Sequence, residues 1–295
     1  MNAHHFDEFA VIDWSGAKSE WHKGIAVAVC ADGDEAPVLV APPGRHWTRQ
    51  AILDWLLEQA QSKRNILISL DLSPSLPFVD ESSYFPGWNS SPHDAKALWA
   101  IVDNLCEQDD HLAASSLLEH IEIRRHFRQQ GFCGDLFKPG AGRMRVCESK
   151  GQAAIPGINP YSCFNLVGAA QVGKSSLTGM RVLHRLGGSI PVWPFDPLPH
   201  QGPALVEIYT SIAARASGVL AKGKSKILNG ALLDLALAVF ASKPHAPLVR
   251  YTDHETDAIL TSAWLRREAA NQQLWTPPRL TPKIAATEGW TFGVS

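Results

Sequence analysis

Two apolar segments of this chain run unbroken until they reach an aspartate, and their placement limits the folds available. Residues 9–13 read FAVID and residues 65–71 read NILISLD. Two more short apolar runs lie between them at 24–30 and 37–41, followed by residues 48–60, where apolar side chains recur with helical spacing. Three meandering strands, a helix and a fourth strand predict an α/β protein. We expect the FAVID strand to lie between the strands at 24–30 and 65–71.

The rest of the chain predicts one more strand and a large insertion. Residues 72–202 hold many of the prolines and little regular periodicity, with no linker on either side. The core pattern returns at 204–209 (ALVEIY), which predicts a fifth strand, and helices follow it. We therefore expect a single domain over 1–295, a mixed five-stranded sheet with flanking helices. Its core comprises 8–71 and 203–295, and the insertion follows the fourth strand.

The composition is that of an ordinary globular protein, with 45% apolar and 19% charged residues. No apolar run approaches the roughly 20 residues of a membrane span, and residues 1–8 do not resemble a secretory signal. The five cysteines are odd in number and never form C-x-x-C, which argues against a disulfide framework or a structural zinc. These features predict a cytoplasmic protein without a membrane partner. With a net charge of −2, nucleic acid of whatever type is a candidate partner only through local basic patches.

Acidic residues interrupt three of the apolar segments. Asp13 and Asp71 each end a predicted strand, and Glu207 lies inside one. Charged side chains are seldom buried unless they are paired or bind a metal. A single aspartate at a strand end often only caps a turn. Three acids on three strands of one sheet favour a functional site instead.

The last long helix adds further acids. Thr252 and Glu255 form a capping box that predicts its start. Asp253 and Asp257 are four residues apart and therefore share one face, where Asp257 borders an apolar stripe. Asp253 is also explained by the helix dipole, which favours acids in a first turn. His254 is either a surface residue or a partner of the acids.

The segments FAVIDWSGAKS, ILISLDLSPSLP, LVEIYTS and DHETDAILTSAWL resemble the domain of unknown function 429 family, bacterial proteins described as predicted nucleases with a ribonuclease H-like fold. Asp13, Asp71, Glu207 and Asp257 match the acids of that family's pattern. The resemblance covers both ends of the chain and only pieces of 72–202. Pro74 stands three residues after Asp71 where the family often has two, so the turn there differs. The resemblance implies a ribonuclease H-like fold and nuclease activity.

Phosphodiester hydrolysis gives these acids a chemical role. Two divalent ions held by carboxylates activate a water and stabilise the charged transition state, and Mg²⁺ and Mn²⁺ prefer such oxygen ligands. The predicted function is therefore a metal-dependent nuclease in which Asp13 bridges the ions, Asp71 and Asp257 each hold one, and Glu207 is a further ligand or orienting residue. Lys226 is a candidate phosphate contact, although a plain surface lysine explains it too. The alternative is a non-catalytic scaffold protein with the same fold.

A rival motif spans Gly168 to Ser175 and fits G-x-x-x-x-G-K-[ST], the phosphate-binding loop of nucleotide-binding ATPases and kinases. Such folds need a later strand that ends in an aspartate for Mg²⁺. The only strong strand after this motif, at 204–209, has a glutamate in its middle. We therefore expect a structural turn here, with an ATPase or kinase as the alternative function.

Overall fold

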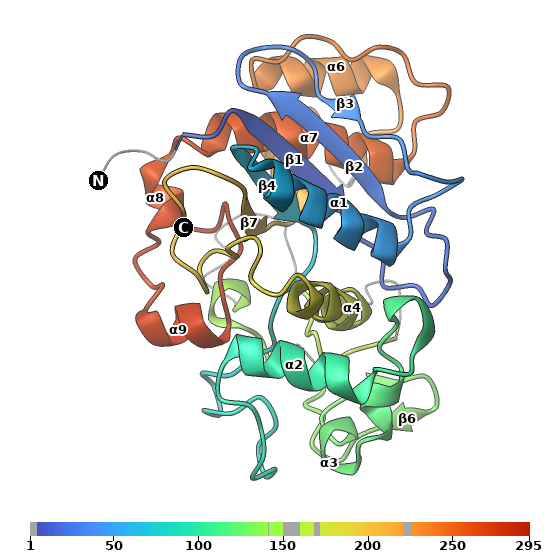
Figure 1. Ribbon diagram of the computed structural model, residues 1–295, viewed down its shortest axis with the longest axis vertical. Coiled ribbons are helices and arrows are strands. Elements are labelled where there is room, and N and C mark those ends of the chain that lie inside the picture. The colour runs from blue at the N-terminus through green and yellow to red at the C-terminus, as the bar shows by residue number, and fades with distance from the viewer. Residues whose placement is uncertain (1–4, 141, 150–159, 168–171, 221–225) are drawn as a thin grey trace.

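A mixed five-stranded sheet forms the centre of the protein, as the sequence predicts (Figure 1). The computed structural model describes residues 5–140, 142–149, 160–167, 172–220 and 226–295. β1 pairs antiparallel with β2 and parallel with β4, so the FAVID strand lies between its two expected neighbours. The strand order is β3 (Val38–Leu39), β2 (Ala26–Ala31), β1 (Glu8–Asp13), β4 (Ile66–Leu70) and β7 (Ala204–Glu207).

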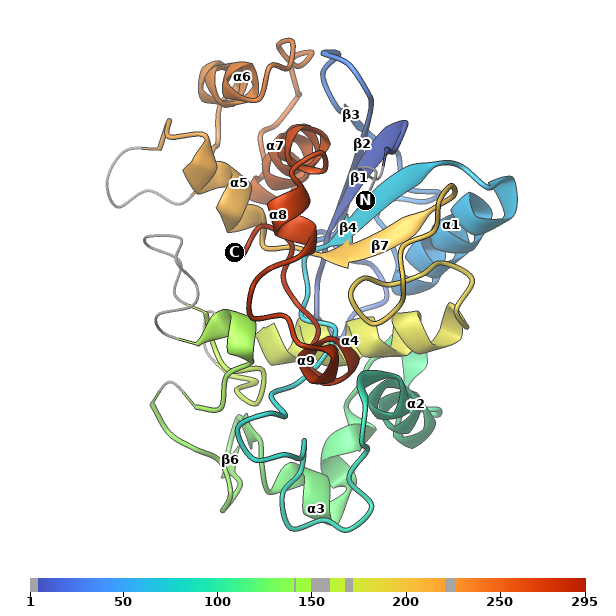
Figure 2. The same cartoon turned by 90° about the vertical axis from the view of Figure 1, so that its left-hand side faces the viewer.

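Helices cover both faces of the sheet (Figure 2). α7 packs on one face with α5 and α6 around it, whereas α1 covers the other face and α4 and α2 lie below it. No helix in the described part of the chain is long and apolar enough to cross a bilayer. The helices are α1 (Arg49–Ser62), α2 (Ala95–Leu105), α3 (Ile121–Arg124), α4 (Val172–Arg185), α5 (Thr210–Ala216), α6 (Gly230–Val239), α7 (Asp253–Glu268), α8 (Gln272–Trp275) and α9 (Pro282–Thr287), with a small hairpin of β5 (Arg128–Gln129) and β6 (Phe132–Cys133).

Successive side chains of β1 point to opposite faces and join two different cores. Ala10 and Ile12 pack in the core under α1 and α4, while Phe9 and Val11 pack against α7. This alternation follows from the pleat of a strand. It assigns every odd-numbered residue of β1, including its last one, Asp13, to the α7 face.

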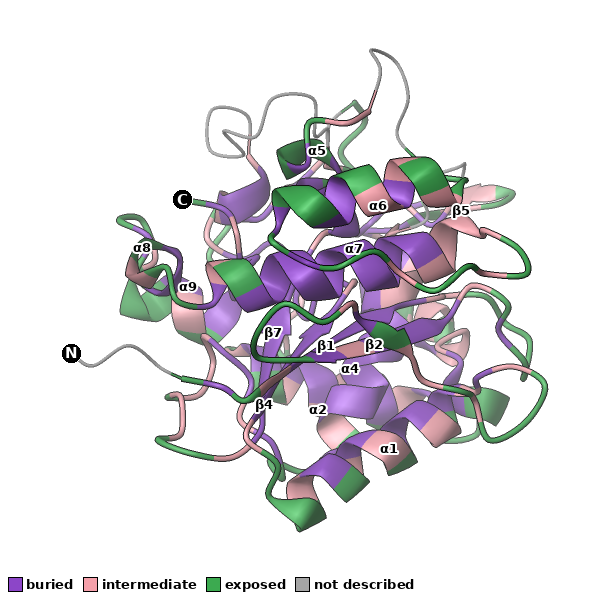
Figure 3. Ribbon diagram, turned by 90° about the horizontal axis from the view of Figure 1, so that it is seen from above, coloured by how far each residue is buried: buried purple, intermediate pink, exposed green. Residues whose placement is uncertain are grey.

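α7 is buried far more completely than an amphipathic stripe predicts. Every residue from 256 to 266 is buried, because β1 and β2 cover one side of the helix and α5 and α6 cover the other (Figure 3). Its start is as expected, since the Thr252 hydroxyl accepts a bond from the Glu255 backbone N–H at 3.3 Å. Ser262 Oγ donates to the Phe9 carbonyl at 2.9 Å and fixes the helix on β1.

The segment 72–202 packs through α4 against the ends of the central strands β1 and β4. Trp14, one residue after β1, donates its indole N–H to Thr178 Oγ1 on α4 at 3.1 Å. Gly179 lies against Leu72, just beyond β4, so closely that a Cβ there would come within 2.4 Å of the leucine. α4 is therefore held against the ends of both strands that terminate in aspartate.

Candidate functional site

Asp13 and Asp71 lie next to each other where the paired strands β1 and β4 end. Ile12 pairs with Leu70, and the Asp71 N–H continues the ladder by donating to the Ile12 carbonyl at 3.0 Å. Asp13 and Asp71 are the next residues along these strands, and neighbouring strands are about 4.8 Å apart. Both point to the same face of the sheet as Val11, which packs against α7. The parallel pairing thus sets two carboxylates side by side on one face.

α7 brings a third acid and a histidine to the same place. Asp257 is buried, and its charge acts on both Asp13 and Asp71. His254, one turn earlier, has its Nδ1 3.2 Å from Asp13 Oδ2 and its Nε2 3.7 Å from Asp253 Oδ1. The hydrogen bond to Asp13 raises the pKa of His254, and burial opposes that rise only in part.

Lys226 compensates Asp257. Its ammonium forms an ion pair with Asp257 Oδ2, although the lysine side chain remains 43% exposed. Burial lowers the pKa of Lys226, but the neighbouring charge of Asp257 outweighs burial and the net shift is upward. Lys226 therefore occupies one oxygen of the carboxylate that the sequence predicts as a metal ligand.

Burial raises the pKa of all three acids, and repulsion from neighbouring carboxylates adds to the rise for Asp71 and Asp257. Burial, and then the charges of Asp13 and Asp257, raise the pKa of Asp71 to about 8. The Thr210 hydroxyl donates to Asp71 at 3.1 Å and offsets this only partly. Burial raises the pKa of Asp257 to about 6 and also raises that of Asp13 despite the bond to His254. The cluster carries more acid than its surroundings neutralise.

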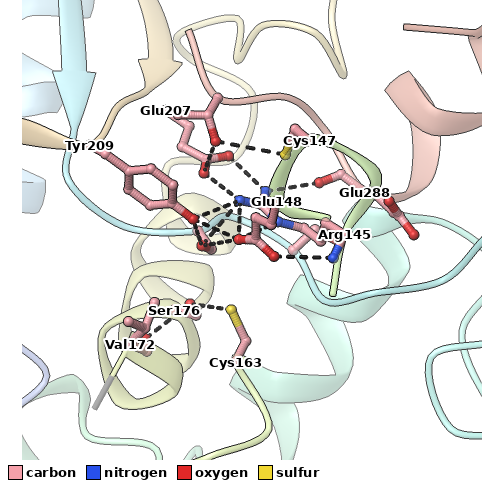
Figure 4. Close-up of polar contacts among 12 residues, drawn as sticks. Arg145, Cys147, Glu148, Cys163, Val172, Ser176, Glu207, Tyr209 and Glu288 are labelled. Atoms are coloured by element: carbon pink, nitrogen blue, oxygen red, sulfur yellow. Dashed lines mark hydrogen bonds and ion pairs between the residues drawn. The ribbon is translucent and has the colours of Figure 1, made fainter. Parts of the chain in front are cut away.

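Glu207 does not join this cluster, contrary to the sequence prediction. It shares the parity of Leu205, which packs in the core on the α1 side, so it points to the opposite face of the sheet. There Arg145 Nη1 donates to its carboxylate at 2.7 Å (Figure 4). Thr291 Oγ1 donates to the same carboxylate at 2.7 Å. Arg145 also binds Glu148, and all three charged side chains are fully buried. Glu207 is part of a structural ion network.

The donor set of the cluster fits a hard divalent ion, because Asp13, Asp71 and Asp257 offer only carboxylate oxygens. The side chains are not drawn together around a point. In the described part of the chain, no three His, Cys, Asp or Glu side chains form a group arranged to hold a metal ion. Asp13 is engaged by His254 and Asp257 by Lys226. A metal ion that uses both oxygens of Asp257 would have to displace Lys226 from Oδ2.

A cavity of about 380 Å³ opens beside Asp71 and includes a residue that the sequence prediction discounted. Lys174 and Ser175, the end of the 168–175 motif, line it from the first turn of α4. Residues 168–171 of that motif lie outside the described residues. The sequence carries this signal as the G-K-S of residues 173–175, which the structure places in the first turn of α4. Its position beside Asp71 depends on the packing of α4 under the sheet, which no local pattern indicates.

The pairing of His254 with Asp13 predicts a titration above the ordinary histidine value of 6.5. We expect imidazole ¹⁵N NMR to show this raised pKa in the folded protein, so the charged pair persists below that pKa and is lost as pH rises through it. Asp13→Asn should lower the pKa of His254 by removing the facing charge. His22, whose pKa burial lowers to about 4, is the internal control and should not respond. A wild-type His254 pKa at or below 6.5 would contradict the pairing.

The buried network predicts that Glu207→Gln is strongly destabilising. The substitution keeps the shape of the side chain and leaves part of the Arg145 charge uncompensated, which costs about 3–5 kcal/mol of unfolding free energy. Urea denaturation measures this cost. Asp54→Asn, on the exposed side of α1, should change stability by no more than about 0.5 kcal/mol. Equal stabilities of the two variants would show that the network contributes nothing.

Comparison with known proteins gives no further assignment. No protein-family model, no curated protein sequence and no solved structure matches this chain. The geometry of Asp13, Asp71 and Asp257 is therefore the basis for inferring what the chain does.

Proposed function

We propose that this protein is a metal-dependent nuclease, a hydrolase of phosphodiester bonds with a ribonuclease H-like core. One observation carries the proposal. Asp13 and Asp71 end neighbouring parallel strands on one face of the sheet, and Asp257 of α7 is buried against them. Like charges rarely gather in a buried site unless a cation or a proton compensates them.

The topology and the sequence resemblance support the same proposal. Two antiparallel pairings followed by two parallel ones are compatible with the ribonuclease H-like fold that the sequence resemblance implies. Asp13, Asp71 and Asp257 are three of the four acids that match the domain of unknown function 429 family. A non-catalytic scaffold would gain stability by losing such acids. The unpaired cysteines suit the cytoplasm, where we place the protein.

Asp13, Asp71 and Asp257 would hold Mg²⁺ or Mn²⁺ through their carboxylate oxygens. Such an ion supplies an activated water and stabilises charge on the phosphoryl oxygens. Lys226 holds Asp257 until it is displaced, and its ammonium is then free to contact the substrate phosphate. His254 orients Asp13 through Nδ1, and its partly exposed ring can pass a proton between that carboxylate and solvent.

Replacing Asp13 or Asp71 by Asn tests the proposal directly. The amide keeps the shape but removes the charge that binds the ion, so cleavage of nucleic acid with Mg²⁺ or Mn²⁺ should fall by a factor on the order of 10³. The assay uses labelled DNA and RNA, single-stranded and duplex. Asp54→Asn is the control and should cleave like wild type. The absence of cleavage of every substrate by the wild-type protein, or full activity of both variants, would refute the nuclease.

The raised pKa of Asp71 predicts that the metal-free protein loses stability as pH rises. The folded state holds a proton up to about pH 8, whereas the unfolded chain releases it near 3.8, so unfolding becomes more favourable between these values. The free energy of unfolding of Asp71→Asn should therefore exceed that of wild type by about 1 kcal/mol or more at pH 8 in EDTA, and the two should be equal below pH 4. Adding Mn²⁺ should raise the melting temperature of wild type more than that of the variant. A variant less stable at every pH would mean that Asp71 is structural.

A further inference from the structure

A second cavity adjoins the one at Asp71 and has a different character. It measures about 240 Å³ and shares Gly16 and Lys174 with its neighbour. We call it the side cavity. Its other lining residues include Lys18, Gln129, Gln130, Leu118, Leu166 and Leu177.

The position of Lys174 between the two cavities is fixed by backbone packing. A Cβ on Gly16 would lie 2.5 Å from both the Lys174 carbonyl carbon and the Ser175 nitrogen, so the turn after β1 touches the backbone of α4. Gly173 approaches the Cys163 carbonyl as closely, since a Cβ there would lie 2.0 Å away. Lys174 therefore keeps a constant relation to the strand that ends in Asp13.

The side cavity suits an anion bearing a small, partly apolar group. No acidic side chain is among its described lining residues, and neither Lys18 nor Lys174 forms an ion pair within the described part of the chain. Leucine side chains supply apolar walls, while the amides of Gln129 and Gln130 supply donors and acceptors. Proteins that read an unstacked base use this combination of apolar contact and polar edges.

The volume sets the size of the occupant. Pockets for drug-sized ligands measure about 300–1,000 Å³. At about 240 Å³ the side cavity has room for one base and not for a base pair. A duplex cannot enter it without releasing a nucleotide from the stack.

We propose that the side cavity binds one unpaired nucleotide of the substrate strand, with its base between the leucines and glutamines and its phosphate against Lys174. Resting on the proposed function, this makes single-stranded or locally unpaired nucleic acid the substrate class. The bond to be cleaved then belongs to the adjoining nucleotide, whose phosphate lies in the cavity at Asp71. Lys174 is a binding residue here and takes no part in the bond cleavage.

The test is binding without cleavage, by fluorescence anisotropy in EDTA, with a six-nucleotide single strand and a blunt hairpin duplex as probes. We expect the single strand to bind at least tenfold more tightly. Lys174→Ala should weaken single-strand binding about tenfold or more by removing the phosphate contact, and should reduce its salt dependence by about one ion. Ala114→Phe, which fills the cavity from a partly exposed position, should weaken it similarly. Lys243→Ala, on an exposed loop, is the matched control and should bind like wild type.

The outcomes separate this inference from the nuclease. If both cavity variants weaken binding but wild type cleaves nothing in Mn²⁺, the side-cavity proposal is supported and the nuclease proposal is wrong. If wild type cleaves nucleic acid and the KM for single strands is the same in Lys174→Ala and Ala114→Phe as in wild type, only the side-cavity proposal is overturned. Equal affinity for duplex and single strand, or no binding by wild type, also overturns it. Lys174→Gln, which keeps a polar side chain and removes the charge, guards against a loss of binding caused by misfolding and should reproduce the Lys174→Ala result at a wild-type melting temperature.

Discussion

The parallel pairing of β1 with β4 is the constraint on which the site depends. Register and pleat together dictate that the residues after Ile12 and Leu70 stand side by side on one face. A shift of one residue in either strand would send Asp13 and Asp71 to opposite faces. α7 then needs only to cross that face for Asp257 to meet them. The acidic site is thus a consequence of strand register more than of any local loop.

A second buried interaction ties the remote parts of the chain to this sheet. Arg145 comes from the segment 72–202 and Glu207 from the edge strand, yet they pair where both are fully buried. Such a pair contributes little net stability over apolar packing, but removing one partner is costly. Its value therefore lies in specifying how the segment joins the sheet. A backbone contact positions α4 in a similar way, because only glycine fits at position 16 against the α4 backbone.

The sequence predicts the elements that local chemistry determines. The five strands, the cap at Thr252 and the acids at the strand ends follow from apolar periodicity and side-chain type. Glu207 shows the limit, because its face depends on the register of β7 against β4, which no local pattern carries. Lys174 shows it again: the motif was visible, but its nearness to Asp71 is a tertiary contact. Three of the four predicted acids, Asp13, Asp71 and Asp257, lie together, and only the place of Glu207 depended on a register that the sequence does not reveal.

Under the proposed function, the two adjoining cavities would let a nearly neutral chain bind a polyanion. A net charge of −2 gives no attraction for nucleic acid at a distance. The acids gather at Asp71, whereas Lys18 and Lys174, which form no ion pair within the described residues, line the side cavity. Lys174 lines both cavities. A phosphate held at Lys174 is repelled from the bare carboxylates, and a cation on those carboxylates reverses the repulsion. In this proposal binding and cleavage are separable in charge as well as in space, so that the strand would be held before the metal ion binds.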